Sequence, residues 1–164
     1  MINVLVTGTS GTNTGTQIMT ALLLCPERYR IVVTDIEKFS YGSLKVESSY
    51  VVPPATSPDY ISEILSICKK EDIQVLIPGS EPELKACSEK REFFEAADVH
   101  LLTNDPNTIN ISMDKIQTIG FLEGKGFLCP KSLIIDHRTA MLQEAIEAGI
   151  HGLLDWAAEQ SRTN

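Results

Sequence analysis

A glycine-rich segment that follows the first apolar run contains the first residues that could bind a ligand. Gly8, Gly11 and Gly15 are spaced G-x-x-G-x-x-x-G, with Ser10 and Thr12 between them. A turn of this kind at a helix start can bind an anion, because the first N–H groups of a helix are unpaired and its dipole is positive there. The spacing matches neither the dinucleotide G-x-G-x-x-G motif nor a P-loop. We therefore interpret Gly8, Ser10, Gly11 and Thr12 as ligand-facing, with a purely structural turn as the alternative.

Three acidic residues follow apolar runs that would end at the same edge of a parallel sheet. Asp35 closes the run over 30–34, at the position of the ribose-binding acid in dinucleotide folds. Glu81 and Glu83 follow the run over 74–77. Open α/β folds place ligands at this edge, so all three are candidate binding residues. The alternatives are a solvated turn residue for Asp35, simple solvation for Glu81, and a capping box of Ser80 with Glu83.

Lys115 stands where a positive charge is unfavourable in the predicted secondary structure. With Ser112 as N-cap, Lys115 takes the third position of its helix, where a cation opposes the helix dipole. Such a placement costs some tenths of a kcal/mol unless an anion offsets it. Lys115 is therefore expected either to pair with Asp114 or to bind a phosphate.

The elements that would position these residues alternate along the chain. Short apolar runs alternate with stretches of helical period, which predicts an α/β fold: a doubly wound, Rossmann-like, mostly parallel five-stranded sheet with a C-terminal helical extension. The strands are predicted over 3–7, 30–34, 50–52, 74–77 and 99–102. Helices are predicted over about 15–24, from 56–59 to about 70, from 80 to about 95, from 104, and from 112 to about 124 or 126. A small strand over 133–135 and a helix over 139–148 complete the prediction.

Composition and charge exclude several classes of protein. The 164 residues contain 22 acidic and 14 basic side chains, for a net charge of −8, which argues against a nucleic-acid-binding surface. A hydrophobic content of 43% is typical of a soluble globular protein. The first residues lack a basic region and a long apolar run, so we expect no signal peptide, no membrane span and a cytoplasmic location. Four isolated cysteines and three scattered histidines favour reduced core thiols and argue against a zinc site or a disulfide framework.

Taken together, the motifs resemble the N-terminal, pre-ATP-grasp portion of ATP-grasp ligases, particularly the carbamoyl-phosphate synthase large subunit-like group that includes carboxylate-amine ligases. The matching segments are VLVTG at 4–8, VTD at 33–35, YVVPP at 50–54, PDY at 58–60, VLIPGSEPEL at 75–84, MDK at 113–115 and GFLCPK at 126–131. The resemblance covers residues 1 to 148. It implies a Rossmann-like pre-ATP-grasp domain over 1–112, and the truncated start of an ATP-grasp region over 113–164.

The resemblance also implies an activity and a set of site residues. Members of the family join a carboxylate to an amine through an acyl-phosphate made from ATP, with Mg²⁺ balancing the phosphate charge. The glycine loop, Glu81 and Glu83 would then face the cleft for the acceptor substrate, and Lys115 would lie near the ATP phosphates. The implied partners are a small-molecule substrate, the missing ATP-grasp half or a second copy in a homodimer, with no nucleic acid and no membrane.

The same resemblance predicts what this chain does not do alone. The family's second phosphate-binding lysine, flexible glycine-rich loop, adenine contacts and Mg²⁺ ligands have no match after Gly149. We therefore expect no catalytic residue, no metal site, and neither ATP nor Mg²⁺ bound by the chain alone, which would be inactive by itself.

Two other functions are compatible with the residues. One is a dinucleotide-binding, oxidoreductase-like module that uses the glycine loop and Asp35. The other is a non-catalytic assembly module with an apolar surface over 126–154, for which Leu153, Leu154 and Trp156 are candidates.

Overall fold

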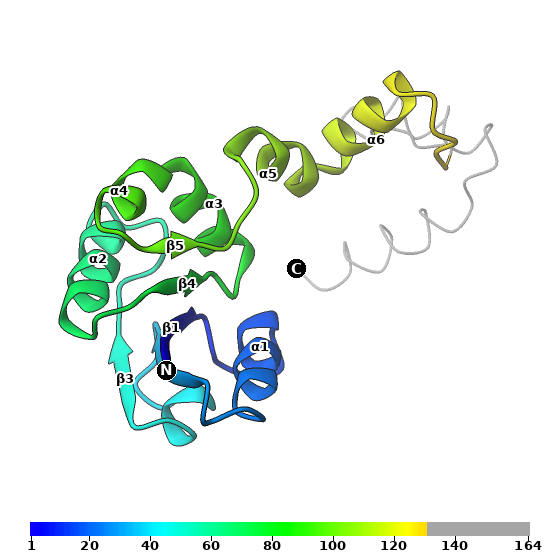
Figure 1. The fold of residues 1–164 in the computed structure, drawn as a ribbon. Coiled ribbons are helices and arrows are strands. Elements are labelled where there is room, and N and C mark those ends of the chain that lie inside the picture. Colours follow the sequence, from blue (N-terminus) through cyan, green and yellow to red (C-terminus); the bar gives the residue numbers. More distant parts are fainter. Residues whose placement is uncertain (131–164) are drawn as a thin grey trace, which may run out of the picture. The chain divides into compact units, whose positions relative to one another are not determined.

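The computed structural model describes residues 1–130, which divide between two compact units, Met1–Lys115 and the residues from Ile116 onward. The first unit is built on a five-stranded sheet in the order β3-β2-β1-β4-β5, and every strand pair in it is parallel (Figure 1). The strands are β1 (Ile2–Thr7), β2 (Tyr29–Asp35), β3 (Ser48–Val51), β4 (Val75–Ile77) and β5 (His100–Leu101). The predicted fold class is confirmed, with a wholly parallel sheet.

The helices follow the strands in the order expected of a doubly wound fold. They are α1 (Thr14–Leu22), the 3₁₀ helix η1 (Gly42–Leu44), α2 (Tyr60–Lys70), α3 (Glu81–Glu89), α4 (Arg91–Ala96), α5 (Pro106–Met113) and α6 (Lys115–Gly124). The chain leaves β1 toward β2 on one side and returns to β4 on the other. The strand order therefore reverses at β1, and ligands of such sheets bind beyond the carboxyl ends of the strands at this point.

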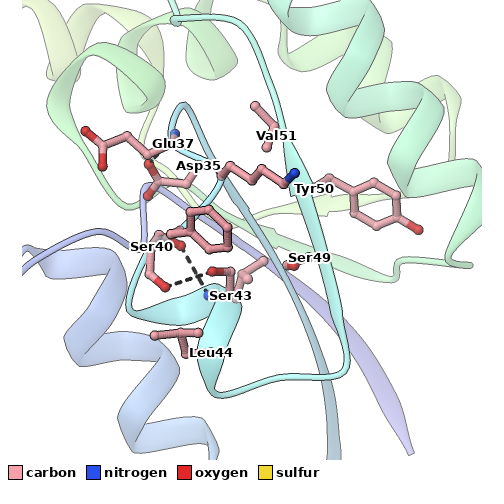
Figure 2. A pocket seen from close by; sticks show the side chains of 11 residues that line it. Asp35, Glu37, Ser40, Ser43, Leu44, Ser49, Tyr50 and Val51 are labelled. Carbon is pink, nitrogen blue, oxygen red and sulfur yellow. Dashed lines mark hydrogen bonds between the residues drawn. The ribbon is translucent and has the colours of Figure 1, made fainter.

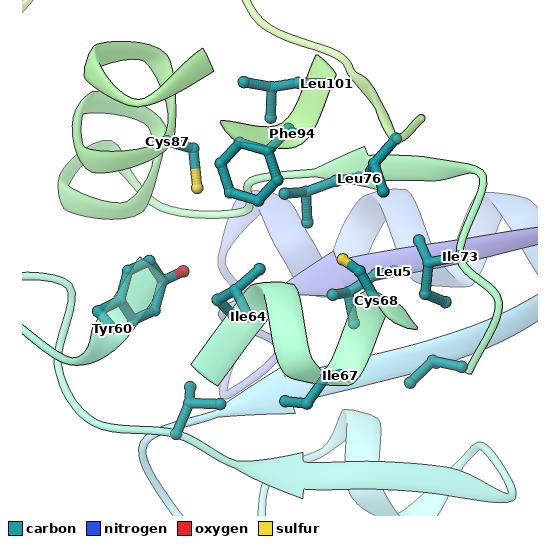
Figure 3. Close-up of a cluster of buried hydrophobic side chains, with 13 residues drawn as sticks. Leu5, Tyr60, Ile64, Ile67, Cys68, Ile73, Leu76, Cys87, Phe94 and Leu101 are labelled. Atoms are coloured by element: carbon teal, nitrogen blue, oxygen red, sulfur yellow. The ribbon is translucent and has the colours of Figure 1, made fainter. Parts of the chain in front are cut away.

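Side chains that alternate along the central strands fill a core on each face of the sheet. Leu5 belongs to the larger cluster, together with Ile64 of α2 and Phe94 of α4 (Figure 3). Val4 and Val6 point to the other face, into a second cluster that contains Met19 of α1. Because both faces are covered, the middle of β1, from Val4 to Val6, is an unbroken apolar run, as is usual for strands of parallel sheets.

Several predicted boundaries are wrong. The helix predicted over 80–95 is interrupted at Lys90, whose backbone (φ −119°, ψ 25°) leaves the helical region, so that α3 and α4 are separate. The helix predicted from the 56–59 motif begins at Tyr60, after a turn in which the Tyr60 N–H donates to the Ser57 carbonyl at 3.2 Å. The third strand lies two residues earlier than predicted at its start, because Ser48 already pairs with Val32.

Lys115 has a different helical position from the one predicted. Ser112 is not an N-cap: it lies inside α5, and its hydroxyl donates to the Ile109 carbonyl at 3.0 Å. Asp114 has an extended backbone that separates the two helices, and Lys115 is the first residue of α6. The helix predicted from 104 is α5, and its N-cap is Asp105, whose Oδ1 accepts the Thr108 N–H at 3.0 Å.

The prediction of core cysteines agrees with the structure at two of the four positions. Cys68 and Cys87 are buried in the core, whereas Cys25 and Cys129 are partly exposed, and all four thiols are free. Within residues 1–130, no helix is both long and apolar enough to span a membrane. The strand predicted over 133–135, the helix over 139–148 and the candidates Leu153, Leu154 and Trp156 lie outside the described residues.

Candidate substrate cavity at the carboxyl edge of the sheet

A cavity of about 280 Å³ lies where β1 and β2 end and α3 begins. It brings together four of the residues singled out in the sequence, Gly8, Ser10, Asp35 and Glu83. The rest of its lining consists of Asn13, Ile36, Pro54, Ala55, Thr56, Ser80 and Pro82. The candidates Gly11, Thr12, Glu81 and Lys115 are exposed and are not part of this lining.

Gly8 is the point at which the first loop touches the start of α3. Its N–H still donates to the Thr34 carbonyl at 2.9 Å, which extends the β1–β2 pairing by one bond. The backbone then turns with φ +60°, a conformation that favours glycine. A Cβ at this position would lie 2.5 Å from Glu83 Oε2. The glycine thus allows the backbone to approach a carboxyl group of its own chain.

The N-terminus of α1 uses its donors within the chain. The Gly15 N–H donates to the Gly79 carbonyl at 3.2 Å, and the Thr16 N–H donates to Asn13 Oδ1 at 3.0 Å. Asn13 is the N-cap of the helix, and its carbonyl accepts the Gln17 N–H at 3.2 Å. The Gly15 and Thr16 N–H groups, two of the donors that could bind an anion at the start of the helix, therefore already have partners.

Glu83 is 6% exposed and accepts hydrogen bonds from two hydroxyl groups. The Ser80 hydroxyl donates to its Oε2 at 2.7 Å, and the Tyr60 hydroxyl donates to its Oε1 at 3.3 Å. Ser80 occupies the N-cap position of α3 but makes no side-chain bond to the backbone. The capping-box alternative is therefore wrong, because the two side chains bind each other and not the backbone N–H groups of the helix start.

Burial raises the pKa of the Glu83 carboxyl, and the negative charge of Asp35 raises it further, against the hydrogen bonds from Ser80, Thr7 and Tyr60. Burial also raises the pKa of Tyr60 above its usual range, and raises that of Cys87 to about 12. Figure 3 shows Tyr60 and Cys87 within the larger core cluster. Thr7, Tyr60, Glu83 and Cys87 are therefore buried and interact with one another, and Glu83 also lines the cavity.

Asp35 is 3% exposed and has one unsatisfied oxygen. Its Oδ1 accepts the Glu37 N–H at 3.1 Å, whereas its Oδ2 is buried without a hydrogen-bond partner among the described residues. A buried carboxyl oxygen without a donor is unfavourable, because it has lost its hydration. Asp35 lines this cavity and also a second one.

Asp35 also lines a second cavity, of about 360 Å³, between the end of β2, η1 and β3 (Figure 2). Ser43 closes the turn there, since its N–H donates to Ser40 Oγ at 3.1 Å and its hydroxyl donates to the Ser40 carbonyl at 2.8 Å. Phe39 and Leu44 line this cavity and are 77% and 74% exposed. The sequence did not predict this feature.

Thr7 and Tyr60 are the site residues that sequence reasoning missed. Thr7 is the last residue of β1, and its Oγ1 also accepts the Gly79 N–H at 3.2 Å. Its position at the end of a strand could have identified it, because the same position identified Asp35 as a candidate. The position of Tyr60 could not identify it in this way, since the helix was predicted to begin before it and Tyr60 does not follow a strand.

Comparison with known proteins extends these observations. Residues 4–102 match the model of the PylC-like, N-terminal domain family. No curated protein matches the sequence.

Solved structures share the fold at low sequence identity. N5-carboxyaminoimidazole ribonucleotide synthetase from Thermotoga maritima is 17% identical over 90% of this chain and 36% of that one, with a TM-score of 0.60. The biotin carboxylase domain of a single-chain bacterial carboxylase is 15% identical over 93% of this chain and 35% of that one, with a TM-score of 0.59. Glycinamide-RNase-transformylase T from Mycobacterium tuberculosis is 13% identical over 80% of this chain and 37% of that one, with a TM-score of 0.55. The chain thus spans little more than a third of these three proteins.

Proposed function

Because this chain belongs to the family of PylC-like N-terminal domains, which are N-terminal domains of ATP-grasp ligases, we propose that residues 1–115 form the substrate side of such a ligase. The proposed enzyme is an ATP-dependent carboxylate-amine ligase of the carbamoyl-phosphate synthase-like group. The cavity at the carboxyl edge of the sheet would hold a small-molecule substrate. The observation that carries this proposal is that Gly8, Ser10, Asp35 and Glu83 line one cavity at the position where the strand order reverses.

The described residues do not fit Mg²⁺-ATP. The donors of Gly15 and Thr16 at the start of α1 are engaged within the chain, and Glu83 lies against Gly8, where a phosphate would otherwise approach the glycine turn. Two carboxyl groups at this edge would repel a polyphosphate. We therefore propose that ATP and Mg²⁺ bind another part of a longer protein, or a partner chain, and that this chain has no ligase activity by itself.

In this proposal the role of the described residues is to bind and orient the substrate. Gly8, Ser10 and Asp35 provide polar atoms on one side of the cavity, and Glu83 provides a carboxyl group from α3. Orienting a reactant lowers the barrier of a reaction that another domain carries out. Lys115, which is exposed, would stand near the ATP phosphates of the complete enzyme, and the cytoplasm is its proposed location.

Isothermal titration calorimetry of the 164-residue chain tests this proposal against the dinucleotide alternative. We expect no binding of Mg²⁺-ATP or NADH in the micromolar range, because the Gly15 and Thr16 N–H groups are engaged within the chain and Glu83 lies against Gly8. We expect binding from a panel of small amines and carboxylates. Micromolar binding of Mg²⁺-ATP would contradict the proposed inactivity of the chain, and tight NADH binding would favour the oxidoreductase-like function.

A second candidate function, assembly with another copy, is favoured by the exposed apolar side chains around the second cavity. Phe39, Leu44 and Val51 line it and are exposed. Figure 2 shows Leu44 and Val51 among the side chains of this cavity. Contiguous exposed apolar surface often marks an interaction site. Light scattering at several concentrations tests this function, because a strict monomer that is unchanged by Leu44→Ser would exclude assembly through this surface.

A further inference from the structure

We propose that Glu83 carries a proton in the folded chain, and that loss of this proton releases its side chain from the Gly8 backbone. The contact between the first loop and the start of α3 is then a pH-sensitive latch on the carboxyl-edge cavity. The inference concerns a wall of this cavity and does not depend on which ligand the cavity takes. Its starting point is a carboxyl group that is 6% exposed and lies against a glycine.

No salt bridge holds Glu83 among residues 1–130, where the two that the structure shows join arginines to other glutamates. The charge of Asp35 acts on Glu83, and that charge is also negative. A carboxylate that is buried without a counter-charge is unfavourable, because it has lost its hydration without gaining an ion pair. A proton on Glu83 removes the charge and with it most of this cost.

The hydrogen bonds of Glu83 come from hydroxyl groups, which suit a protonated carboxyl as well as an ionised one. Ser80 donates to its Oε2 at 2.7 Å and Tyr60 donates to its Oε1 at 3.3 Å. The Thr7 hydroxyl also interacts with the carboxyl group. Because a hydroxyl oxygen can accept a hydrogen bond as well as donate one, these groups can accept the proton of a neutral Glu83.

The backbone N–H groups of two glycines near the carboxyl are engaged elsewhere. The Gly8 N–H donates to the Thr34 carbonyl at 2.9 Å, and the Gly79 N–H donates to Thr7 Oγ1 at 3.2 Å. Donors of this kind would favour the charged form of a carboxyl group. A Cβ on Gly8 would lie 2.5 Å from Glu83 Oε2, so a water molecule has no room on that side either.

Titratable groups face Glu83 from three elements: Asp35 from β2, Tyr60 from α2 and Cys87 from α3. From β1, Thr7 contributes a hydroxyl that does not titrate. Burial raises the pKa of Glu83 and the charge of Asp35 raises it further, against the hydrogen bonds. Burial raises the pKa of Tyr60 as well, and that of Cys87 to about 12, so both stay neutral while Glu83 titrates.

The cavity gives an ionised Glu83 access to water. Glu83 belongs to its lining, and a volume of about 280 Å³ holds several water molecules, since each takes about 30 Å³ in the liquid. An ionised side chain gains hydration when it turns away from Gly8 into this space. The cavity therefore becomes more negative as the pH rises, and the first loop loses its contact with α3.

The test follows the carboxyl carbon of Glu83 by NMR in the 164-residue chain while the pH is varied, with the signal assigned through its bonds to the Glu83 backbone. We expect a midpoint above the value of about 4.3 of an ordinary glutamate. The amide signals of Gly8 and Ser80 should change with the same midpoint. Glu83→Gln keeps the size of the side chain and should remove this step from the Gly8 signal. Glu81→Gln, the matched control on an exposed acid of the same helix, should leave the step in place.

Stability gives a second measurement. The unfolded chain loses the Glu83 proton at a lower pH than the folded chain, so ionisation opposes folding as the pH rises above about 4.3. We expect the wild type to lose stability relative to Glu83→Gln over this range, as followed by chemical denaturation.

Three results would overturn the inference. A Glu83 midpoint at or below about 4.3 would show that the buried carboxyl is ionised in the folded chain. A Gly8 signal that does not change at the Glu83 midpoint would exclude the latch. A step in the Gly8 signal that disappears in Asp35→Asn would assign the titration to Asp35. None of these results bears on the proposed substrate site, which calorimetry tests separately, and the wild-type titration decides the inference even if Glu83→Gln does not fold.

Discussion

The contact between Gly8 and Glu83 links the first loop of the sheet to the helix that follows β4. Glu83 is buried, and its Oε2 lies close to the Gly8 backbone, where a side chain would collide with it. Gly11, in the same loop, has a similar φ of +63° but has open space around it. Substitution of Gly11 therefore measures the free-energy cost of the left-handed backbone alone, whereas substitution of Gly8 adds the cost of a collision with Glu83.

We expect Gly8→Ala to lower the free energy of unfolding by about 2–4 kcal/mol, because it adds steric crowding to the left-handed backbone strain. Gly11→Ala, the matched control, should cost about 1–2 kcal/mol, which is the backbone strain alone. Chemical denaturation measures both values. In a Glu83→Ala background the cost of Gly8→Ala should fall to that of Gly11→Ala, and an unchanged cost would contradict the assigned contact.

Glu71 connects three elements at the opposite edge of the sheet. Arg30 of β2 pairs with its carboxylate, and the Tyr50 hydroxyl of β3 donates to the same group. Lys70 Nζ stands 4.7 Å from the centre of the Tyr50 ring. The hydrogen bonds from Tyr50 and Arg30 lower the pKa of Glu71 below its usual value.

Glu71→Gln is expected to lower the free energy of unfolding by about 1–3 kcal/mol at pH 7, because two bonds to a charged acceptor weaken. Since the folded pKa is lowered, the stabilisation is present above the unfolded pKa of about 4.3 and is lost as the pH falls through the folded value. The difference between wild type and variant should therefore shrink toward pH 3. Glu63→Gln, an exposed position on α2, is the control, and a difference that stayed constant with pH would contradict the assignment.

At the scale of elements, strands were easier to predict than helix ends. The apolar runs that form β1, β2 and β4 are buried on both faces, so composition alone located them. The break at Lys90 was not predictable, because REFFEA continues a helical period in the sequence and the break depends on tertiary packing. The N-cap predicted at Ser112 was also wrong, since a serine inside a helix can donate a hydrogen bond to a backbone carbonyl of the preceding turn.

The ends of α2 and α4 contain the two non-glycine residues with positive φ among residues 1–130, Asp72 (φ 51°) and Asp98 (φ 57°). After Asp98, the Val99 N–H donates to the Phe94 carbonyl at 2.9 Å, which is a helix-ending bond that calls for a left-handed residue before it.

We expect Asp98→Gly to raise the free energy of unfolding by up to about 1 kcal/mol, because glycine adopts this conformation without strain. Asp59→Gly is the control, since Asp59 is also exposed but has φ −87° at the start of α2. Thermal unfolding measures both variants. Destabilisation by Asp98→Gly equal to that by Asp59→Gly would contradict the role assigned to the helix end.

At the scale of the whole molecule, both buried clusters lie within the first unit. Their members extend from Val4 to Leu101, and the unit ends at Lys115. We therefore expect residues 1–115 alone to retain cooperative unfolding with nearly the midpoint of the full chain, as measured by circular dichroism. Loss of the transition on removal of residues 116–164 would show that the later residues complete the core.

The candidate site was only partly predictable for a physical reason. Strand ends identified Asp35, and the glycine spacing identified Gly8, because both signals are local in the sequence. The burial of Glu83 and the engagement of the α1 donors by Gly79 and Asn13 depend on segments brought together by folding. Sequence reasoning therefore indicated an anion at the glycine turn, whereas the folded chain places a carboxyl group there.

We propose the carboxyl-edge cavity as the substrate site and expect the start of α1 not to bind a nucleotide. Amide chemical-shift mapping of the full chain distinguishes these two positions when a small amine such as propylammonium, Mg²⁺-ATP and NADH are added in turn. We expect saturable changes centred on Gly8, Ser10, Thr56 and Ser80 for propylammonium, and none at Thr14, Gly15 and Thr16 for either nucleotide. Saturable changes at the start of α1 with a nucleotide, together with an unperturbed cavity, would contradict it.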